Sequence, residues 1–253
     1  MRLDKYIAAI TDYSRNEVKR LLKQGEVLIN GNTTCNPAQH INENTDNIEL
    51  FGEPLGQLRP RYFMLNKPLN TVCSTEDSEH PTVIDLLDEP NREKLHIAGR
   101  LDKDTTGLVL ITDDGQWNHR ITSPKQQCFK TYLVTLAFPL SDEAVKELET
   151  GVMLRNETKA TLPAIVVRID EHTIQLSIQQ GKYHQVKRML AAVGNHVEAL
   201  HRQQVASIVL DNTLALGEYR ELTDKEIAFD ITHETNSTND MSAMSNIGEA
   251  CTT

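Results

Sequence analysis

The sequence predicts an α+β fold in which a small domain, residues 1–58, precedes a larger domain, residues 59–231, and a tail, residues 232–253. Its 253 residues, 39% of them hydrophobic, suffice for two cores of unequal size. Residues 52–60 concentrate Gly and Pro, which is typical of a linker. Beyond them, strand and helix candidates are interleaved without a regular βαβ period. This pattern favours a mixed or antiparallel central sheet flanked by helices over a doubly wound sheet.

In the small domain, Ser14 and Glu17 have the spacing of a capping box, and the predicted helix ends before Gly25. Residues 26–30 form a predicted strand that runs into an Asn-Gly turn, and a second strand is predicted at 47–51. The larger domain contains strand candidates at 62–66, 107–112, 131–138, 164–169, 173–179 and 207–210. Helices are expected at 82–87, 142–150, 185–193 and from about 223 to 229.

Charge is distributed unevenly along the chain. The formal net charge of −10 argues against a general nucleic-acid binder, so any RNA site must be local. Residues 1–25 carry a net charge of +3. Arg15, Lys19 and Lys23 recur every four residues and form a predicted basic ridge along one face of the helix. The charges alone fit a solvated helix face equally well. The candidate RNA-binding residues are Arg2, Lys5, Arg15, Lys19, Arg20 and Lys23.

The remaining composition bears on location and on the tail. No apolar run of about 18 residues occurs, and the first residues lack the apolar stretch of an export signal, so we expect neither membrane insertion nor export. The four cysteines form no CxxC pair, which favours a reducing, cytoplasmic location. Residues 232–253 contain no Lys or Arg and few large apolar side chains, so we expect a disordered, dispensable tail.

The segment 96–111 places charges in a Gly-flanked loop before a buried strand, as active sites often do. Its carboxylates, Asp102 and Asp104, could bind a metal, cap a turn or perform covalent chemistry. Arg100 and Lys103 would repel a cation, which weakens the metal interpretation. Asp before Thr and Gly commonly forms a structural turn, and Asp104 is the candidate for that role.

Three ordered motifs resemble those of pseudouridine synthases. Residues 99–108 (Gly-Arg-Leu-Asp-Lys-Asp-Thr-Thr-Gly-Leu) resemble the catalytic motif, and residues 130–132 and 181–189 resemble the second and third motifs. With an S4-like N-terminal RNA-binding domain, the resemblance covers residues 1–231. It is closest to the RsuA type, which modifies small-subunit ribosomal RNA.

The resemblance implies an isomerase that converts one uridine of 16S ribosomal RNA, uridine 516, to pseudouridine without cofactor or metal. Asp102 attacks C1′ or removes the C2′ proton, and the sequence leaves both routes open. Lys187 pairs with Asp102, Tyr132 stacks on the uracil, and Arg100 fills the space left by the extruded nucleotide. On spacing alone, Tyr132 is a strand aromatic and Lys187 a solvated helix charge.

Further expectations concern partners and rival functions. The partner implied is ribosomal RNA or a small-subunit assembly intermediate, bound by a monomer. The rivals are a large-subunit rRNA synthase, a noncatalytic ribosome-binding factor, and metal-dependent phosphoryl transfer by Asp102, Asp104 and Asp113 or Asp114. No histidine shows a metal-ligand pattern, and we assign His184 no role. Two pairs are expected to contact the RNA backbone: His119 with Arg120, and His201 with Arg202.

Overall fold

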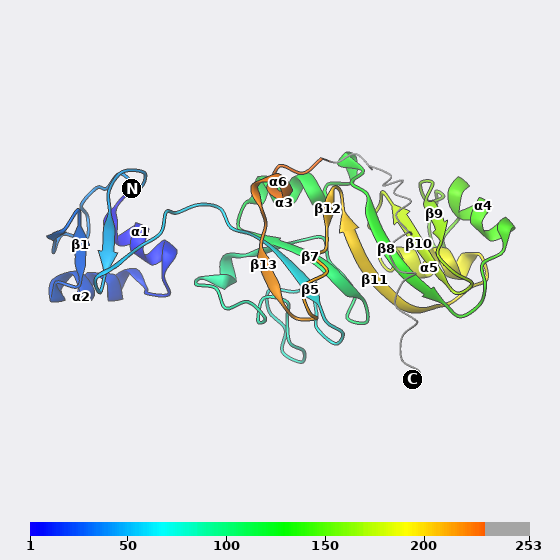
Figure 1. The fold of residues 1–253 in the computed structure, drawn as a ribbon, viewed down its shortest axis with the longest axis horizontal. Helices are drawn as coiled ribbons and strands as arrows, with labels where there is room; N and C mark the ends of the chain where they lie inside the picture. The colour runs from blue at the N-terminus through cyan, green and yellow to red at the C-terminus, as the bar shows by residue number, and fades with distance from the viewer. Residues whose placement is uncertain (231–253) are drawn as a thin grey trace, which may run out of the picture.

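The computed structural model describes residues 1–230 of the 253. A small N-terminal unit and a larger unit are joined by an extended segment without regular structure at 55–61 (Figure 1). The predicted tail at 232–253 lies outside the described residues, and its disorder stays a prediction. Within residues 1–230, no helix is long and apolar enough to cross a membrane.

The N-terminal unit packs two helices, α1 (Leu3–Ile10) and α2 (Arg15–Gln24), against a four-stranded antiparallel sheet of order β2-β1-β3-β4. The capping box of Ser14 and Glu17 is confirmed, and α2 ends at Gly25, whose φ of +83° suits glycine. Residues 53–54 pair with the sheet, so the linker begins after residue 54 and not at residue 52 as predicted. The four strands are β1 (Val27–Ile29), β2 (Asn32–Thr33), β3 (Ile48–Leu50) and β4 (Glu53–Pro54).

The larger unit is built on a nine-stranded sheet whose main path is β13-β5-β7-β11-β8-β10-β9. Strands β7 and β11 are parallel, whereas the neighbouring strands elsewhere in this sheet are antiparallel, so the predicted mixed sheet is confirmed. The strands are β5 (Tyr62–Lys67), β6 (His96–Ala98), β7 (Thr106–Thr112), β8 (Lys130–Leu136), β9 (Ile165–Arg168), β10 (Thr173–Ile178), β11 (Val197–Val205), β12 (Ile208–Val209) and β13 (Tyr219–Glu221).

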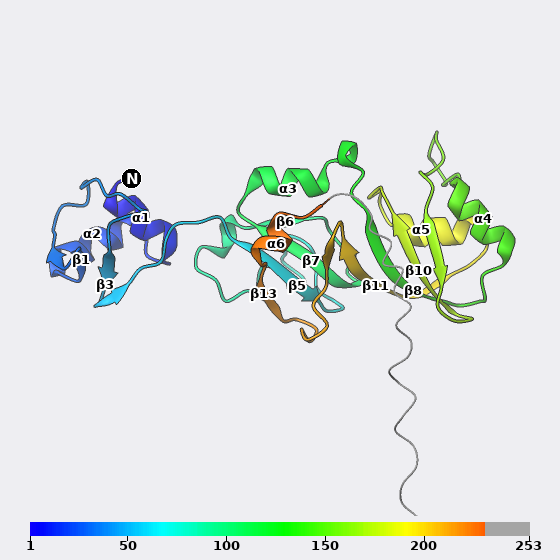
Figure 2. The ribbon, with the colours of Figure 1, turned by 45° about the horizontal axis from the view of Figure 1, so that its top comes forward.

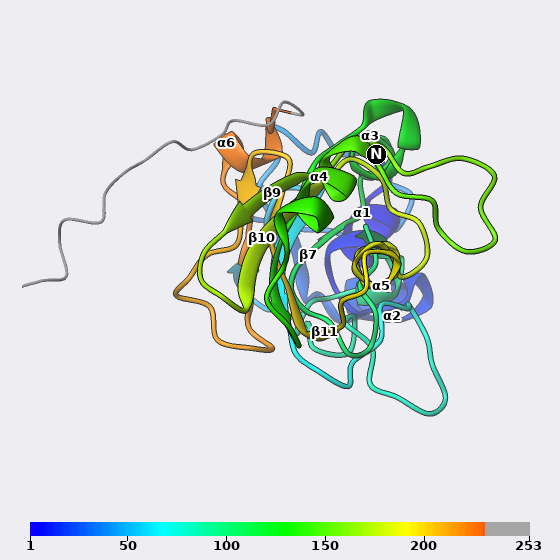
Figure 3. The same ribbon diagram turned by 90° about the vertical axis from the view of Figure 1, so that its right-hand side faces the viewer.

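Successive side chains alternate between the two faces of the sheet, and each face packs into a separate hydrophobic core. On β7, Val109 and Ile111 join one cluster, whereas Leu108 and Leu110 join the other. The first core is covered by α4 (Asp142–Thr150) and α5 (Gln185–Ala192), and the second by α3 (Gly115–Thr122) and α6 (Asp224–Ile227). Figure 2 shows α3 lying over the β6 and β7 end, and Figure 3 shows α5 and α6 on opposite sides of the strands.

The structure corrects the expected helix at 82–87. Thr82 and Asp85 hydrogen-bond each other's backbone and side chain, and the backbone bonds there join residues three apart, as in tight turns. The apolar residues Val83, Ile84 and Leu87 are buried as predicted for a packed segment. The sequence-based prediction also missed β11, which is the longest strand of the sheet.

One asparagine ties the two units together. The side chain of Asn91 donates to the carbonyls of Thr11, at 2.6 Å, and Ala9, at 3.4 Å, near the end of α1. Its backbone N–H donates to the carboxylate of Asp12 at 3.1 Å. These bonds fix one edge of the N-terminal unit against the larger one.

Candidate active site

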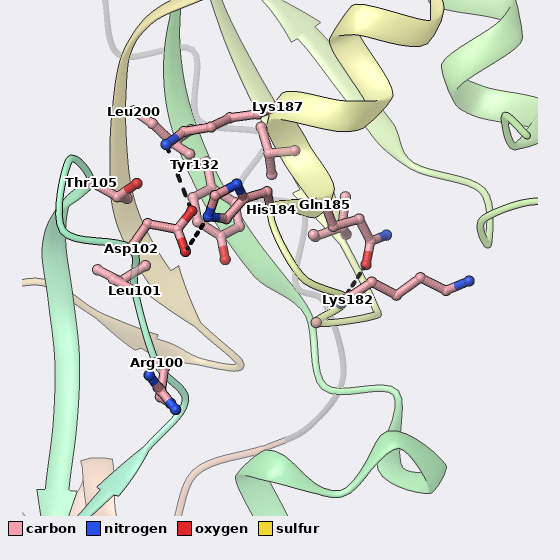
Figure 4. A pocket seen from close by; sticks show the side chains of 13 residues that line it. Arg100, Leu101, Asp102, Thr105, Tyr132, Lys182, His184, Gln185, Lys187 and Leu200 are labelled. Atoms are coloured by element: carbon pink, nitrogen blue, oxygen red, sulfur yellow. Dashed lines mark hydrogen bonds and ion pairs between the residues drawn. The ribbon is translucent and has the colours of Figure 1, made fainter. Parts of the chain in front are cut away.

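Asp102 lies in the loop between β6 and β7, in a turn closed by the N–H of Thr105 donating to the Asp102 carbonyl at 3.1 Å. The Asp102 side chain is 30% exposed. The loop borders a pocket with about 450 Å³ of open space. Its lining includes Arg100, Leu101, Asp102, Thr105, Tyr132, Ile178, Lys182, His184, Gln185, Val186, Lys187 and Leu200 (Figure 4).

Two buried cations support this loop from beneath. Arg202, 1% exposed, donates to the carbonyls of Leu108 and Gly99 at 2.8 Å each. Lys67, fully buried, donates to the carbonyl of Thr105 at 2.8 Å and to that of Pro68 at 2.9 Å. Burial lowers the pKa of Lys67. Backbone carbonyls thus satisfy both cations and hold the loop's shape.

Gly107 lets β7 approach this buried arginine closely. Its φ is +103°, and a Cβ there would lie 2.3 Å from the carbonyl oxygen of Arg202. This position of β7 therefore requires glycine both for its backbone angle and for the space.

Lys187, on the first turns of α5, reaches into the loop between the two carboxylates. Its Nζ lies 3.6 Å from Asp102 Oδ2 and 2.5 Å from Asp104 Oδ1. The hydrogen bond from Lys187 lowers the pKa of Asp104. Lys187 is therefore shared between the two carboxylates. Asp104 lies in a turn, as predicted, and its carboxylate also holds the ammonium beside Asp102.

His184 also faces Asp102, although the sequence-based prediction assigned it no role. Its Nε2 lies 3.4 Å from Asp102 Oδ1, and Figure 4 shows the two side chains pointing toward each other. The residue has a φ of +48°, which is uncommon outside glycine, directly before α5. Its position inside the third motif was the signal that could have identified it.

Tyr132 and Arg100 occupy different parts of the pocket. Tyr132, on β8, is 8% exposed, and it lies beside Asp102 in Figure 4. Arg100 is exposed at the pocket's edge, where its side chain lies apart from Asp102 in the same view. The fold thus brings Asp102, Lys187 and Tyr132 together and leaves Arg100 exposed at the mouth.

The remaining expected RNA contacts have mixed outcomes. Arg202 cannot meet an RNA backbone because its guanidinium is buried under the loop that carries Asp102, so that expectation is wrong. His201 is half-buried with its Nδ1 2.8 Å from the hydroxyl of Thr106, and burial lowers its pKa. His119 and Arg120 are exposed on α3, where Arg120 lies over the ring of Phe229.

The basic residues of the N-terminal unit are all exposed, but two of them have structural partners. Arg2 and Arg15 pair with the fully buried carboxylate of Asp4 at 2.9 and 2.7 Å. Lys19 donates to its neighbour Asn16. Lys19, Arg20 and Lys23 are exposed on α2.

The acidic groups that the rival metal-dependent phosphoryl transfer would use lie at opposite ends of β7. Asp102 and Asp104 precede this strand, whereas Asp113 and Asp114 follow it, and seven strand residues span roughly 20 Å. Asp113 pairs with Arg61, and Asp114 caps α3. Among residues 1–230, no group of three or more His, Cys, Asp or Glu side chains could hold a metal ion.

Comparisons with known proteins agree with this geometry. Residues 61–192 match the family model described as RNA pseudouridylate synthase, and residues 1–46 match that of the S4 domain. The chain is 53% identical to ribosomal small subunit pseudouridine synthase A of Yersinia pestis, over 90% of this chain and 97% of that protein. The chain is also 53% identical to the protein of that name from Escherichia coli (strain K12), over 90% of this chain and 99% of that protein.

The fold of this chain is also similar to that of a solved structure. The crystal structure of a pseudouridylate synthase shares 47% sequence identity with this chain at a TM-score of 0.66. The match covers 90% of this chain and 99% of that one.

Proposed function

Because the chain belongs to the RNA pseudouridylate synthase family, with an S4 domain before the catalytic domain, we propose that it isomerises uridine 516 of 16S ribosomal RNA. The enzyme class follows from the family, and the small-subunit target is supported by relatives named for that substrate over nearly their whole length. The observation that carries the proposal is the Asp102 carboxylate, held in a pocket between Lys187 and Tyr132.

The proposed reaction breaks the N1–C1′ bond of uridine and joins C1′ to C5. A proton leaves C5 and N1 gains one, so the product is an isomer of the substrate. Asp102 either attacks C1′ or removes the C2′ proton, and either role requires the ionised carboxylate. The ammonium of Lys187 lies 3.6 Å from that carboxylate and pairs with it.

The other pocket residues bind and position the nucleotide in this proposal. The ring of Tyr132 stacks on the uracil from the pocket wall. Arg100, at the mouth, fills the gap that the extruded uridine leaves in the folded RNA. The exposed basic side chains on α2, Lys19, Arg20 and Lys23, bind phosphates of the RNA backbone.

The test is substitution of the carboxylate that both routes require. Asp102→Asn keeps the shape and removes the charge, so tritium release from C5-labelled uridine in unmodified small-subunit rRNA should fall to background. Asp88→Asn, which changes an exposed carboxylate outside the pocket, should retain wild-type release. Near-normal release by Asp102→Asn would refute the assignment, and loss of wild-type release in EDTA would favour the metal-dependent rival.

Sequencing of the rRNA decides the target. A strain lacking this enzyme should contain uridine at position 516, and restoring the wild-type chain should return pseudouridine there. Restoration by Asp102→Asn would instead support a noncatalytic ribosome-binding role.

A further inference from the structure

Tyr183 presents an aromatic ring to solvent beside the catalytic pocket. At 76% relative exposure, it is the most exposed large hydrophobic side chain among the described residues. It directly precedes His184 and α5, which both contribute to the pocket lining. Burial within this protein therefore does not explain the aromatic ring at this position.

The Tyr183 ring is already stacked on one face. Its centroid lies 3.8 Å from that of His184, and the ring planes differ by 18°. The Nε2 atom of His184 meets the carboxylate of Asp102 at 3.4 Å. One imidazole therefore separates the Tyr183 ring from the reacting carboxylate.

The backbone that carries this ring is held by a charged network. Arg188 donates to the carbonyl of Tyr183 at 3.2 Å and to that of Arg155 at 2.6 Å. Glu157 accepts from Lys182 at 2.8 Å and from Arg188 at 3.4 Å. Lys182 and Arg188 are both paired with Glu157. This surface therefore offers a flat aromatic ring for stacking more than it offers cations for binding a phosphate.

We propose that Tyr183 is a stacking platform for the nucleobase next to the target uridine. This inference rests on the proposed function, because extruding a uridine leaves its neighbour without a stacking partner. An aromatic ring stacks on any base, since every base has a π-face. The pre-stacked Tyr183 and His184 rings continue the base stack toward Asp102 and align the extruded nucleotide with it.

A fluorescence experiment tests the stacking directly. The sequence contains a single tryptophan, Trp117, which is 2% exposed, so Tyr183→Trp adds one exposed reporter. The probe is a seven-nucleotide single-stranded RNA with a central uridine, compared with the same RNA lacking the two flanking bases. We expect the intact RNA to quench the added emission and the base-lacking RNA to leave it unchanged. Equal quenching by both RNAs, or quenching by neither, overturns the proposal.

Turnover on unmodified small-subunit rRNA provides the second measurement. Tyr183→Ala should raise KM roughly 5- to 150-fold with kcat nearly unchanged, because the stacking that it removes serves substrate and transition state alike. Tyr183→Phe should stay within about twofold of the wild type, since it keeps the ring. Phe138→Ala removes another exposed aromatic, 63% exposed and outside the pocket lining, and should have no effect.

The outcomes separate this inference from the function on which it rests. A fall in kcat without a rise in KM would mean that Tyr183 acts through His184 on Asp102, and the platform would be refuted. If the wild type forms no pseudouridine, the proposed function fails. The quenching comparison would still decide whether Tyr183 stacks on a base.

Discussion

Lys187 forms ion pairs with two carboxylates that stand two residues apart in the same loop. It lies closer to Asp104 than to Asp102, so its position beside Asp102 depends on a second carboxylate. Replacing Asp104 would therefore alter where the ammonium rests.

We predict that Lys187→Met lowers kcat by roughly 100-fold, the loss typical of catalytic groups displaced by about 1 Å. The free energy of unfolding should fall by only about 1 kcal/mol, because Lys187 and Asp102 are partly exposed at 24% and 30%. Lys187→Arg should lose less activity. Single-turnover tritium release and urea unfolding measure the two effects, and equal kcat for Lys187→Met and wild type would contradict the assigned pairing.

Site residues were predictable where the chemistry is concentrated in a short motif. Asp102, Tyr132 and Lys187 each lie in one of the three motifs, and the structure brings them to one pocket. Arg202 was misassigned because its partners are distant: Gly99, whose carbonyl it bonds, is 103 residues away. From sequence alone a charged side chain is expected to be exposed, because the backbone carbonyls that could accept its hydrogen bonds are not known.

At the scale of elements, local signals predicted the helices that carry their own caps. The Ser14 and Glu17 box starts α2 at the expected place, and the Thr223 and Glu226 box starts α6. Strand β11 was missed because its sequence, Val-Glu-Ala-Leu-His-Arg-Gln-Gln-Val, lacks a clean alternation. Its bulged pairing with β8 and its parallel pairing with β7 come from tertiary contacts.

Helix α6 supplies a pH-dependent prediction. Hydrogen bonds from Arg220 lower the pKa of Glu226 from 4.5 to about 2. A depressed carboxyl pKa adds stability above pH 4.5 that is lost as the pH falls toward 2. Glu226→Gln should therefore lower the free energy of unfolding by about 1–2 kcal/mol at about pH 7. In urea titrations, the difference from wild type should shrink below pH 4.5.

Glu221→Gln provides the matched control for that titration. Glu221 is exposed in β13, and its backbone carbonyl, not its carboxylate, accepts from Arg220. Its variant should unfold like the wild type at each pH. A Glu226→Gln deficit that persists unchanged to about pH 3 would contradict the assigned cause.

At the scale of the whole molecule, the basic ridge and the catalytic pocket belong to different domains, so binding and chemistry should be separable. Replacing Lys19, Arg20 and Lys23 by Gln should weaken rRNA binding and make its salt dependence shallower. The slope of log affinity against log salt should fall by about 0.7–0.9 for each phosphate that the variant no longer neutralises. Arg2 and Arg15 are unsuited to this test because they neutralise the buried Asp4.

The control for the ridge variant removes the same charge from exposed positions of the large domain. Replacing Lys125, Lys146 and Lys225 by Gln should leave the salt slope unchanged. Filter binding from low to physiological salt measures both variants. Equal slopes for the ridge variant and the wild type would mean that the N-terminal helix binds no phosphates.

The parallel pairing of β7 and β11 has a consequence for biosynthesis. The ribosome completes β7 at Thr112, but the strand that lies between β7 and β8 ends at Val205, 93 residues later. At about 5–20 residues per second, the edge of β7 that faces β11 stays unpaired for roughly 5–20 s. The facing edge of β8, which is completed at Leu136, stays unpaired for roughly 3–14 s. Leu200 of β11 lines the pocket, so the pocket is complete only after β11 is inserted. During that interval the unpaired strand edges are most exposed to edge-to-edge aggregation and to binding by chaperones.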